Sequence, residues 1–123
     1  MKPTILLLCV LSLAPMRGFA DNWSGVLVDA HCYASEEGNV NPLDTNTYAD
    51  TDRNFELRYC HPKAHTKTFA IVQEDGESLK LDVAGDAKAA EIVRNHNTKA
   101  NLIVAVTGDL KKQTIQVNSI ALR

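Results

Sequence analysis

Apolar and polar positions alternate in several short segments of the chain, and this alternation predicts β-strands. The segment Trp23–Val28 is rich in β-formers, and Gly25 marks a position where a strand can bend sharply. A continuous β-prone run over 68–73 leads into a glycine-containing turn at 74–77, and apolar residues then alternate with charged ones over 79–83. The pattern therefore predicts one strand followed, after a long interval, by a β-hairpin.

The apolar spacing then changes from the period of a strand to that of a helix. Asp86 can cap a helix over 86–96, because a side-chain carboxylate can accept hydrogen bonds from the first turn. The apolar positions of this predicted helix fall on one face: Ala89, Ile92 or Val93, and His96. The sequence thus predicts one short helix.

Two further strands follow, at 102–107 and 115–122, joined by a turn predicted at 108–112. Within the last strand the alternation slips by one residue, which a bulge near Asn118–Ser119 would explain. Five strands with one helix between the third and the fourth is the order of the OB-fold, so we expect an all-β, OB-fold-like five-stranded Greek-key barrel. The alternative is an α+β sandwich with the helix on an open sheet.

Residues 1–20 have the organisation of a secretory signal peptide. A positive charge near the start precedes the apolar stretch 5–14, which is too short to cross a bilayer, and Gly18 and Ala20 supply the small residues of a cleavage site. Cleavage would leave residues 21–123 as a single OB-like domain without a membrane span. The sequence therefore predicts an exported protein, periplasmic or secreted.

A long polar interval, residues 33–59, separates the first predicted strand from the hairpin. Turn formers and charged residues dominate it, so we expect a long loop. Cys32 and Cys60 flank the interval, and an even pair of cysteines in a small exported chain predicts a disulfide. The bridge would close a ring of 29 residues, which on the chain-entropy account stabilises the fold by about 3.5 kcal/mol.

The charge of the chain is unevenly distributed. Without residues 1–20, 11 basic and 15 acidic side chains remain, a net charge of −4 where the whole chain has −2. Six acidic side chains and two arginines fall within 33–59. A basic surface for nucleic acid is absent from the sequence, and the predicted hairpin offers only Phe69 for base stacking, so nucleic acid is excluded as a partner.

Three parts of the sequence together resemble a known family. They are the first strand with its continuation, residues 25–32 (GVLVDAHC), the second cysteine Cys60, and the closing segments 104–110 and 115–117. The chain resembles a family of small secreted bacterial proteins classed as an OB-like domain of unknown function. The resemblance implies the fold and the exported location and carries no activity. The interval 33–59 is longer than the corresponding interval expected in that family.

Three histidines lie next to the two cysteines in the sequence. His31 precedes one cysteine, and His61 and His65 follow the other, so the disulfide would bring all three to one rim of the barrel. Imidazoles suit zinc and copper, which gives a periplasmic metal-binding protein as one alternative. With reduced cysteines, the same His and Cys residues could instead form a tetrahedral zinc site. The remaining interpretation is that these are solvated surface residues, with no cofactor.

Aromatic and acidic side chains are interspersed in and beside the interval 33–59. They could pack the loop onto the barrel, or they could present an acidic, aromatic surface to a protein or a small cationic ligand. The candidate partner-binding residues are Tyr33, Glu36, Glu37, Tyr48, Asp50, Asp52, Phe55 and Tyr59. The sequence has no CxxC, GxSxG, Gly-rich phosphate loop or HExxH motif, so we expect a non-enzymatic binding module.

Overall fold

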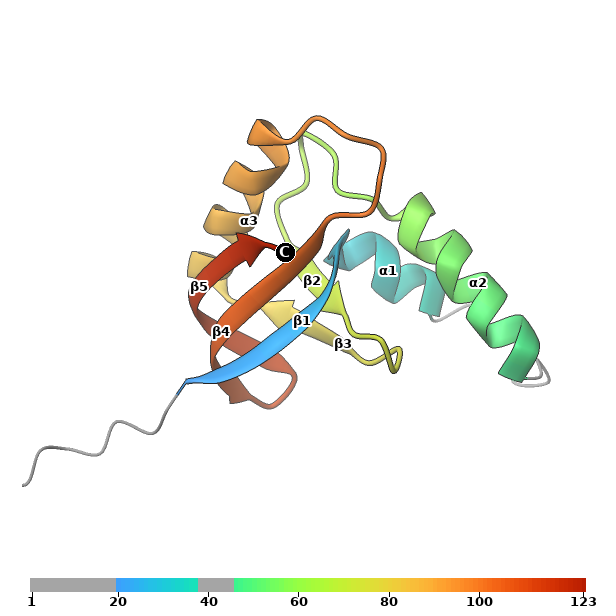
Figure 1. Cartoon of the computed structure of the whole chain (residues 1–123), viewed down its shortest axis with the longest axis horizontal. Coiled ribbons are helices and arrows are strands. Elements are labelled where there is room, and N and C mark those ends of the chain that lie inside the picture. The colour runs from blue at the N-terminus through green and yellow to red at the C-terminus, as the bar shows by residue number, and fades with distance from the viewer. Residues whose placement is uncertain (1–19, 38–45) are drawn as a thin grey trace, which may run out of the picture.

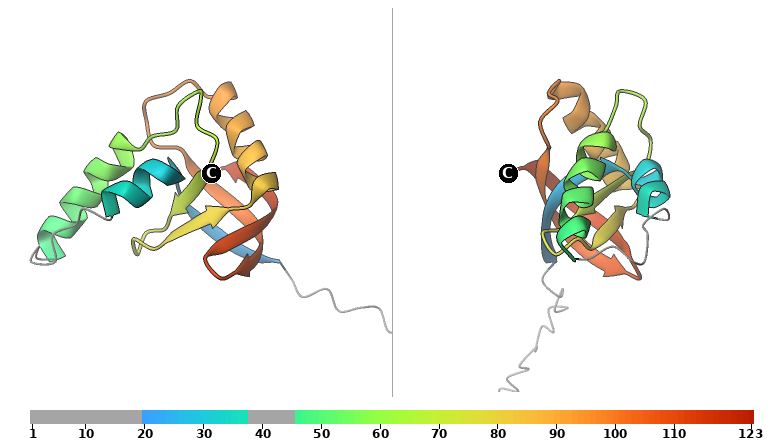
Figure 2. Two further views of the ribbon diagram at one scale, coloured as in Figure 1. Left: turned by 180° about the vertical axis from the view of Figure 1, so that it is seen from behind. Right: turned by 90° about the vertical axis from the view of Figure 1, so that its right-hand side faces the viewer.

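The computed structural model describes residues 20–37 and 46–123, with the backbone alone for 46–52. The predicted signal peptide lies outside the described residues, apart from Ala20. The described chain forms a small barrel with one helix on one side and a pair of helices on the other (Figures 1 and 2).

Five strands close into a barrel in the order β1-β2-β3-β5-β4. The pairs are antiparallel except for β3 with β5, which is parallel. Their bounds are β1 (Asp21–Asp29), β2 (Phe69–Val72), β3 (Ser78–Leu81), β4 (Ile103–Lys111) and β5 (Thr114–Leu122). The predicted OB-fold-like barrel is confirmed. The open-sheet alternative is wrong, because β1 pairs with both β2 and β4 and so closes the sheet on itself.

β1 changes its main partner partway along its length. Residues 21–26 pair with β4, and residues 26–29 pair with β2. Near the change the two backbones come so close that a Cβ added to Gly25 would lie 2.6 Å from the carbonyl oxygen of Val72. Position 25 therefore requires a glycine because no side chain fits between the strands, and the bend predicted there stays a prediction.

The turn predicted at 108–112 is present but begins only at Lys112, at the end of the predicted range. β4 continues to Lys111, and the chain turns at Lys112, which has a φ of 56°. Gly108 lies inside β4, where an added Cβ would collide with the carbonyl oxygen of Gln116. This glycine permits the close approach of two strands rather than a turn.

The bulge predicted in the last strand is confirmed. The register passes from Thr107 opposite Ser119 to Gly108 opposite Val117, which leaves Asn118 without an opposite residue. One extra residue in β5 moves the following side chains to the other face. This accounts for the slip in the alternation.

The predicted helix is present as α3 (Val83–Asn95), but its start and its cap differ from the prediction. Asp82 is the N-cap, and its side chain accepts a hydrogen bond from the backbone N–H of Gly85 at 2.9 Å. Asp86, which was expected to cap the helix, accepts instead from the backbone N–H of Phe69 at 2.9 Å. Asp82 lies between the end of β3 and the start of the helix, so α3 starts three residues earlier than expected.

Most of the predicted apolar face of α3 covers the barrel. Ala89 is fully buried, and Ile92 and Val93 are partly buried against the same core. His96 does not belong to this face, since it is exposed and forms the C-cap. Val83 is also exposed, because the strand expected over 79–83 ends two residues earlier.

The long loop expected over 33–59 is wrong, since its described residues, 33–37 and 46–59, are all helical. Helix α1 (Ala30–Glu37) follows β1 directly, and helix α2 (Asn46–Tyr59) ends beside Cys60. The fold therefore has three helices among the described residues, where one was expected. We call the two helices together with Cys60 the α1–α2 segment.

Two separate clusters of buried side chains explain this arrangement. The barrel core consists of Leu27, Phe69, Ile71, Leu79, Leu81, Ala89, Leu102, Val104, Val106, Ile115 and Val117. The second cluster lies between the α1–α2 segment and the outer face of β1 and β2, and consists of Val28, Ala30, Tyr33, Leu57, Cys60, Ala70 and Val72. β2 and residues 26–28 of β1 have apolar side chains on both faces, which is why these two stretches are continuously apolar.

Candidate functional site

The start of α1 is fixed to the barrel by Asp29. One carboxylate oxygen, Oδ1, accepts a hydrogen bond from the backbone N–H of Cys32 at 3.1 Å, as an N-cap does. The other, Oδ2, accepts from the hydroxyl of Thr66 at 3.0 Å, and the Thr66 hydroxyl accepts from the N–H of Lys63. Asp29 therefore joins the end of β1, the first turn of α1 and the chain that follows α2.

The predicted disulfide between Cys32 and Cys60 is present, with a Cα–Cα distance of 5.5 Å. Cys32 lies in the first turn of α1, and Cys60 directly follows α2. Cys60 is buried in the second cluster, whereas Cys32 is only partly buried against it. The bridge thus holds the two helices together at the end that adjoins the barrel.

The predicted aromatic residues divide into two groups. Tyr33 is buried in the second cluster, and burial together with the nearby carboxylate of Glu37 raises the pKa of its phenol. Phe55 and Tyr59, one helical turn apart on α2, are 57% and 59% exposed. Their rings stack with centroids 6.0 Å apart. Tyr33 therefore packs α1 onto the barrel, while the other two form an exposed apolar patch.

The predicted acidic residues are only partly within the described side chains. Glu36 is partly buried, and Glu37 is exposed near the end of α1. The side chains of Tyr48, Asp50 and Asp52 lie outside the described residues.

Arg53, which no sequence motif marks, connects α2 to the barrel. Arg53 donates a hydrogen bond from Nη1 to the backbone oxygen of Glu74, in the turn between β2 and β3, at 3.2 Å. It lines a hollow of about 410 Å³ beside β1, together with Leu57 and Arg123. The spacing of Arg53 and Leu57, one helical turn apart, is the signal that could have identified this inner face of α2.

The three histidines do not lie together. His61 and His65 line a pocket of about 160 Å³ beside the disulfide, with Tyr59 and Lys63. The Nδ1 atom of His61 is buried and has no hydrogen-bond partner among the described residues. His31 lines a different pocket. Within the described ranges, no group of three or more His, Cys, Asp or Glu side chains is arranged to hold a metal ion.

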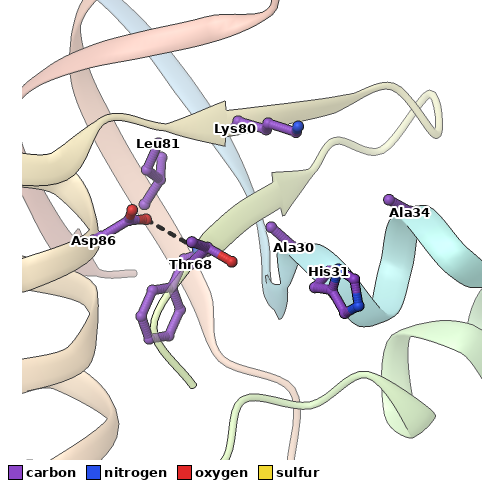
Figure 3. Close-up of a pocket in the computed structure, with 8 residues that line it drawn as sticks. Ala30, His31, Ala34, Thr68, Lys80, Leu81 and Asp86 are labelled. Atoms are coloured by element: carbon purple, nitrogen blue, oxygen red, sulfur yellow. Dashed lines mark hydrogen bonds between the residues drawn. The ribbon is translucent and has the colours of Figure 1, made fainter. Parts of the chain in front are cut away.

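The pocket that contains His31 also contains residues that the sequence reasoning did not propose as a site. It lies between α1, the hairpin of β2 and β3, and the first turn of α3 (Figure 3), with a volume of about 210 Å³. Lys80 and Asp86 contribute charged groups to its lining. The sequence indicates Asp86 only as a helix residue. Its position in the pocket depends on where α1 packs relative to the barrel, which is a contact between distant parts of the chain.

Comparisons of the chain with protein-family models, with curated proteins and with solved structures find no match in any of the three sets. The similarity to small secreted bacterial proteins remains a prediction from the sequence. The helices within the described ranges include none with the length and apolar character needed to span a membrane.

Proposed function

We propose that this protein is an exported, non-enzymatic binding module and that its α1–α2 segment recognises a protein partner carrying basic side chains. The observation that carries the proposal is the exposed stack of Phe55 and Tyr59. Large aromatic side chains left in water on one helix face are costly to solvate, and they are enriched at binding surfaces.

The construction of the segment supports this role. Its inner side, including Tyr33 and Leu57, is buried against β1 and β2. The barrel below it has a core of its own. A rigid barrel that carries a separately packed, disulfide-tied helical surface is suited to present a recognition site, because binding then requires little ordering of the segment.

The chemistry of the partner is inferred from charge and aromaticity. The interval 33–59 contains six acidic and two basic residues. The faces of exposed aromatic rings attract lysine and arginine side chains, by about 0.5–1 kcal/mol at solvent-accessible positions. A basic peptide segment could be attracted both by the acidic side chains and by the aromatic ring faces. A small organic cation could bind to the ring faces alone.

The test is an NMR titration of the isotope-labelled protein with a lysine-rich octapeptide. We expect saturable shifts at the backbone amides of residues 53–60, and binding at least tenfold weaker in the double variant Phe55→Ala/Tyr59→Ala. The matched control is Val83→Ala/Leu110→Ala, which removes two exposed apolar side chains from the barrel and α3.

Three results would overturn the proposal. The peptide could fail to bind, the shifts could spread over all acidic surfaces and vanish with added salt, or the control variant could weaken binding as much as the α2 variant. Salt sensitivity alone would indicate a purely electrostatic contact between exposed charges.

A second candidate function, metal binding, is favoured by the pocket that contains His61 and His65. The buried Nδ1 of His61, without a partner among the described residues, is a donor atom that a zinc or copper ion could satisfy. Calorimetric titration with Zn²⁺ and Cu²⁺ would test it. Binding that His61→Ala abolishes and His31→Ala leaves intact would support this function, and equal binding by both variants would contradict it.

A further inference from the structure

The pocket between α1, the β2–β3 hairpin and α3 is lined by side chains of opposite charge. We propose that it binds a small zwitterion of the free amino-acid class, with the ligand's ammonium group at Asp86 and its carboxylate at Lys80 and His31. This site is distinct from the exposed aromatic pair, and the inference does not depend on the proposed partner recognition.

Two small side chains of α1 leave room for the pocket where the helix begins beside the barrel. Ala30 and Ala34, one helical turn apart, line the pocket from α1. Larger residues at these two positions would fill the space between the helix and β3. Thr68 and Leu81 complete the wall from the barrel, so the lining combines apolar surface with a few polar groups, as is usual for ligand sites.

Asp86 supplies a carboxylate with a fixed orientation. Its Oδ1 accepts the backbone N–H of Phe69 at 2.9 Å. Burial raises the pKa of Asp86, the hydrogen bond from Phe69 lowers it, and the negative charge of Asp82 raises it again. A carboxylate that has lost part of its hydration, with another carboxylate nearby, is stabilised by a cationic ligand group.

Two other residues of the pocket carry the groups that suit an anion. Figure 3 shows Asp86 on α3 at one side, and Lys80 on β3 and His31 on α1 at two separate positions away from it. Lys80 supplies a positive charge, and the imidazole of His31 supplies a ring N–H donor. A ligand with charge of one sign would pair with only one of the two charged residues, whereas a zwitterion pairs with both.

The volume limits the size of the ligand. The pocket measures about 210 Å³, below the range of about 300–1,000 Å³ that is typical for drug-sized ligands. A free amino acid or a short ω-amino acid is compatible with this space. A peptide or an oligosaccharide would have to extend outside it.

The experiment is an NMR titration of the full domain with glycine, β-alanine and γ-aminobutyrate, which differ in the separation of their charges. Methylamine and acetate, each with one of the two charges, are the reference probes. We expect one of the three zwitterions to give saturable shifts at the amides of Ala30, Ala34, Phe69 and Lys80, with a Kd of about 1 mM or lower. Each single-charge probe should bind at least tenfold more weakly.

Two variants test the roles of the charged residues. Asp86→Asn keeps an oxygen that can accept the Phe69 N–H, so the local fold is retained while the charge is lost. Asp86→Asn and Lys80→Gln are each expected to weaken zwitterion binding at least tenfold. The matched controls, Asp109→Asn and Lys111→Gln on β4, and the Phe55→Ala/Tyr59→Ala variant should bind as the parent does.

The proposal fails if no zwitterion gives saturable shifts up to about 10 mM. It also fails if methylamine or acetate binds as tightly as the best zwitterion, or if Asp86→Asn and Lys80→Gln bind like the controls. Because these probes are not lysine-rich peptides, failure here leaves the proposed partner recognition by α2 to its own test.

Discussion

The barrel and the α1–α2 segment are stabilised in different ways. In the barrel, every strand pairs with two others and encloses a core around Phe69 and Ile71. The α1–α2 segment has a smaller buried cluster around Tyr33 and Leu57, a disulfide, and the Asp29 cap. The difference indicates that the barrel is the scaffold and that the α1–α2 segment is attached to it. The helical structure of the segment depends on the buried cluster, the disulfide and the Asp29 cap.

The largest expected effect comes from removing a core side chain of the barrel. Phe69→Ala should lower the free energy of unfolding by about 3–5 kcal/mol, because it leaves a large cavity in the closed core. Leu57→Ala, in the second cluster, should cost less, about 2 kcal/mol, and should mainly release α2. Urea unfolding of both variants measures this difference. Equal losses of global stability would contradict the division into two regions.

The next effect concerns the disulfide. Replacing Cys32 and Cys60 by alanine removes a link that closes a sequence separation of 28 residues. The chain-entropy account gives a loss of up to about 3.5 kcal/mol. We expect this loss to appear as unfolding of the α1–α2 segment, with a decrease in the helical signal of circular dichroism. The near-ultraviolet signal of Trp23, which packs against the barrel core, should persist.

Two capping aspartates offer a smaller, matched comparison. Asp82 accepts hydrogen bonds from Gly85 at 2.9 Å and from Val117 at 3.2 Å, so it joins α3 to β5. Loss of a cap costs about 1 kcal/mol, so Asp82→Ala should lower the global melting temperature. Asp29→Ala should instead release α1 with little change in the melting of the barrel. Differential scanning calorimetry of both variants distinguishes a global from a local effect.

The smallest expected effect is the pH dependence that Asp86 gives to the free energy of unfolding. Burial raises its pKa above the ordinary value of 3.8, so the native state binds its proton more tightly than the unfolded state does. The contribution of this residue to stability is therefore present at low pH and is lost as pH rises through the raised pKa. Relative to the parent, Asp86→Asn should become more stable as pH increases from about 3 to 7. Urea unfolding measures the stability of the variant relative to the parent across this pH range. A relative stability that falls as pH rises would contradict the account.

The barrel was largely predictable from the sequence because its signals are local. The bulge at Asn118 follows from a break in the alternation of apolar and polar residues, and the structure confirms it. The start of α3 was predicted three residues late, because Asp82 and Asp86 are both suitable caps and the choice depends on the contact between Asp82 and β5.

The α1–α2 segment could not be predicted in the same way. Asn, Asp and Thr have low helix propensity, so the residues around α2 indicated a loop. The helix forms because Leu57 and Cys60 are buried against the outer face of β1 and β2, a contact between distant parts of the chain. The disulfide could be predicted from cysteine content, but the separation of His31 from His61 depends on the path of α1.

Hydrogen exchange of the oxidised and the reduced protein is the most direct test of the division between scaffold and attached element. We predict that reduction of the Cys32–Cys60 bridge removes protection from the amides of α1 and α2, while the amides of β1, β2, β4 and β5 keep theirs. Protection lost throughout the barrel, at the same rate as in the two helices, would contradict the account.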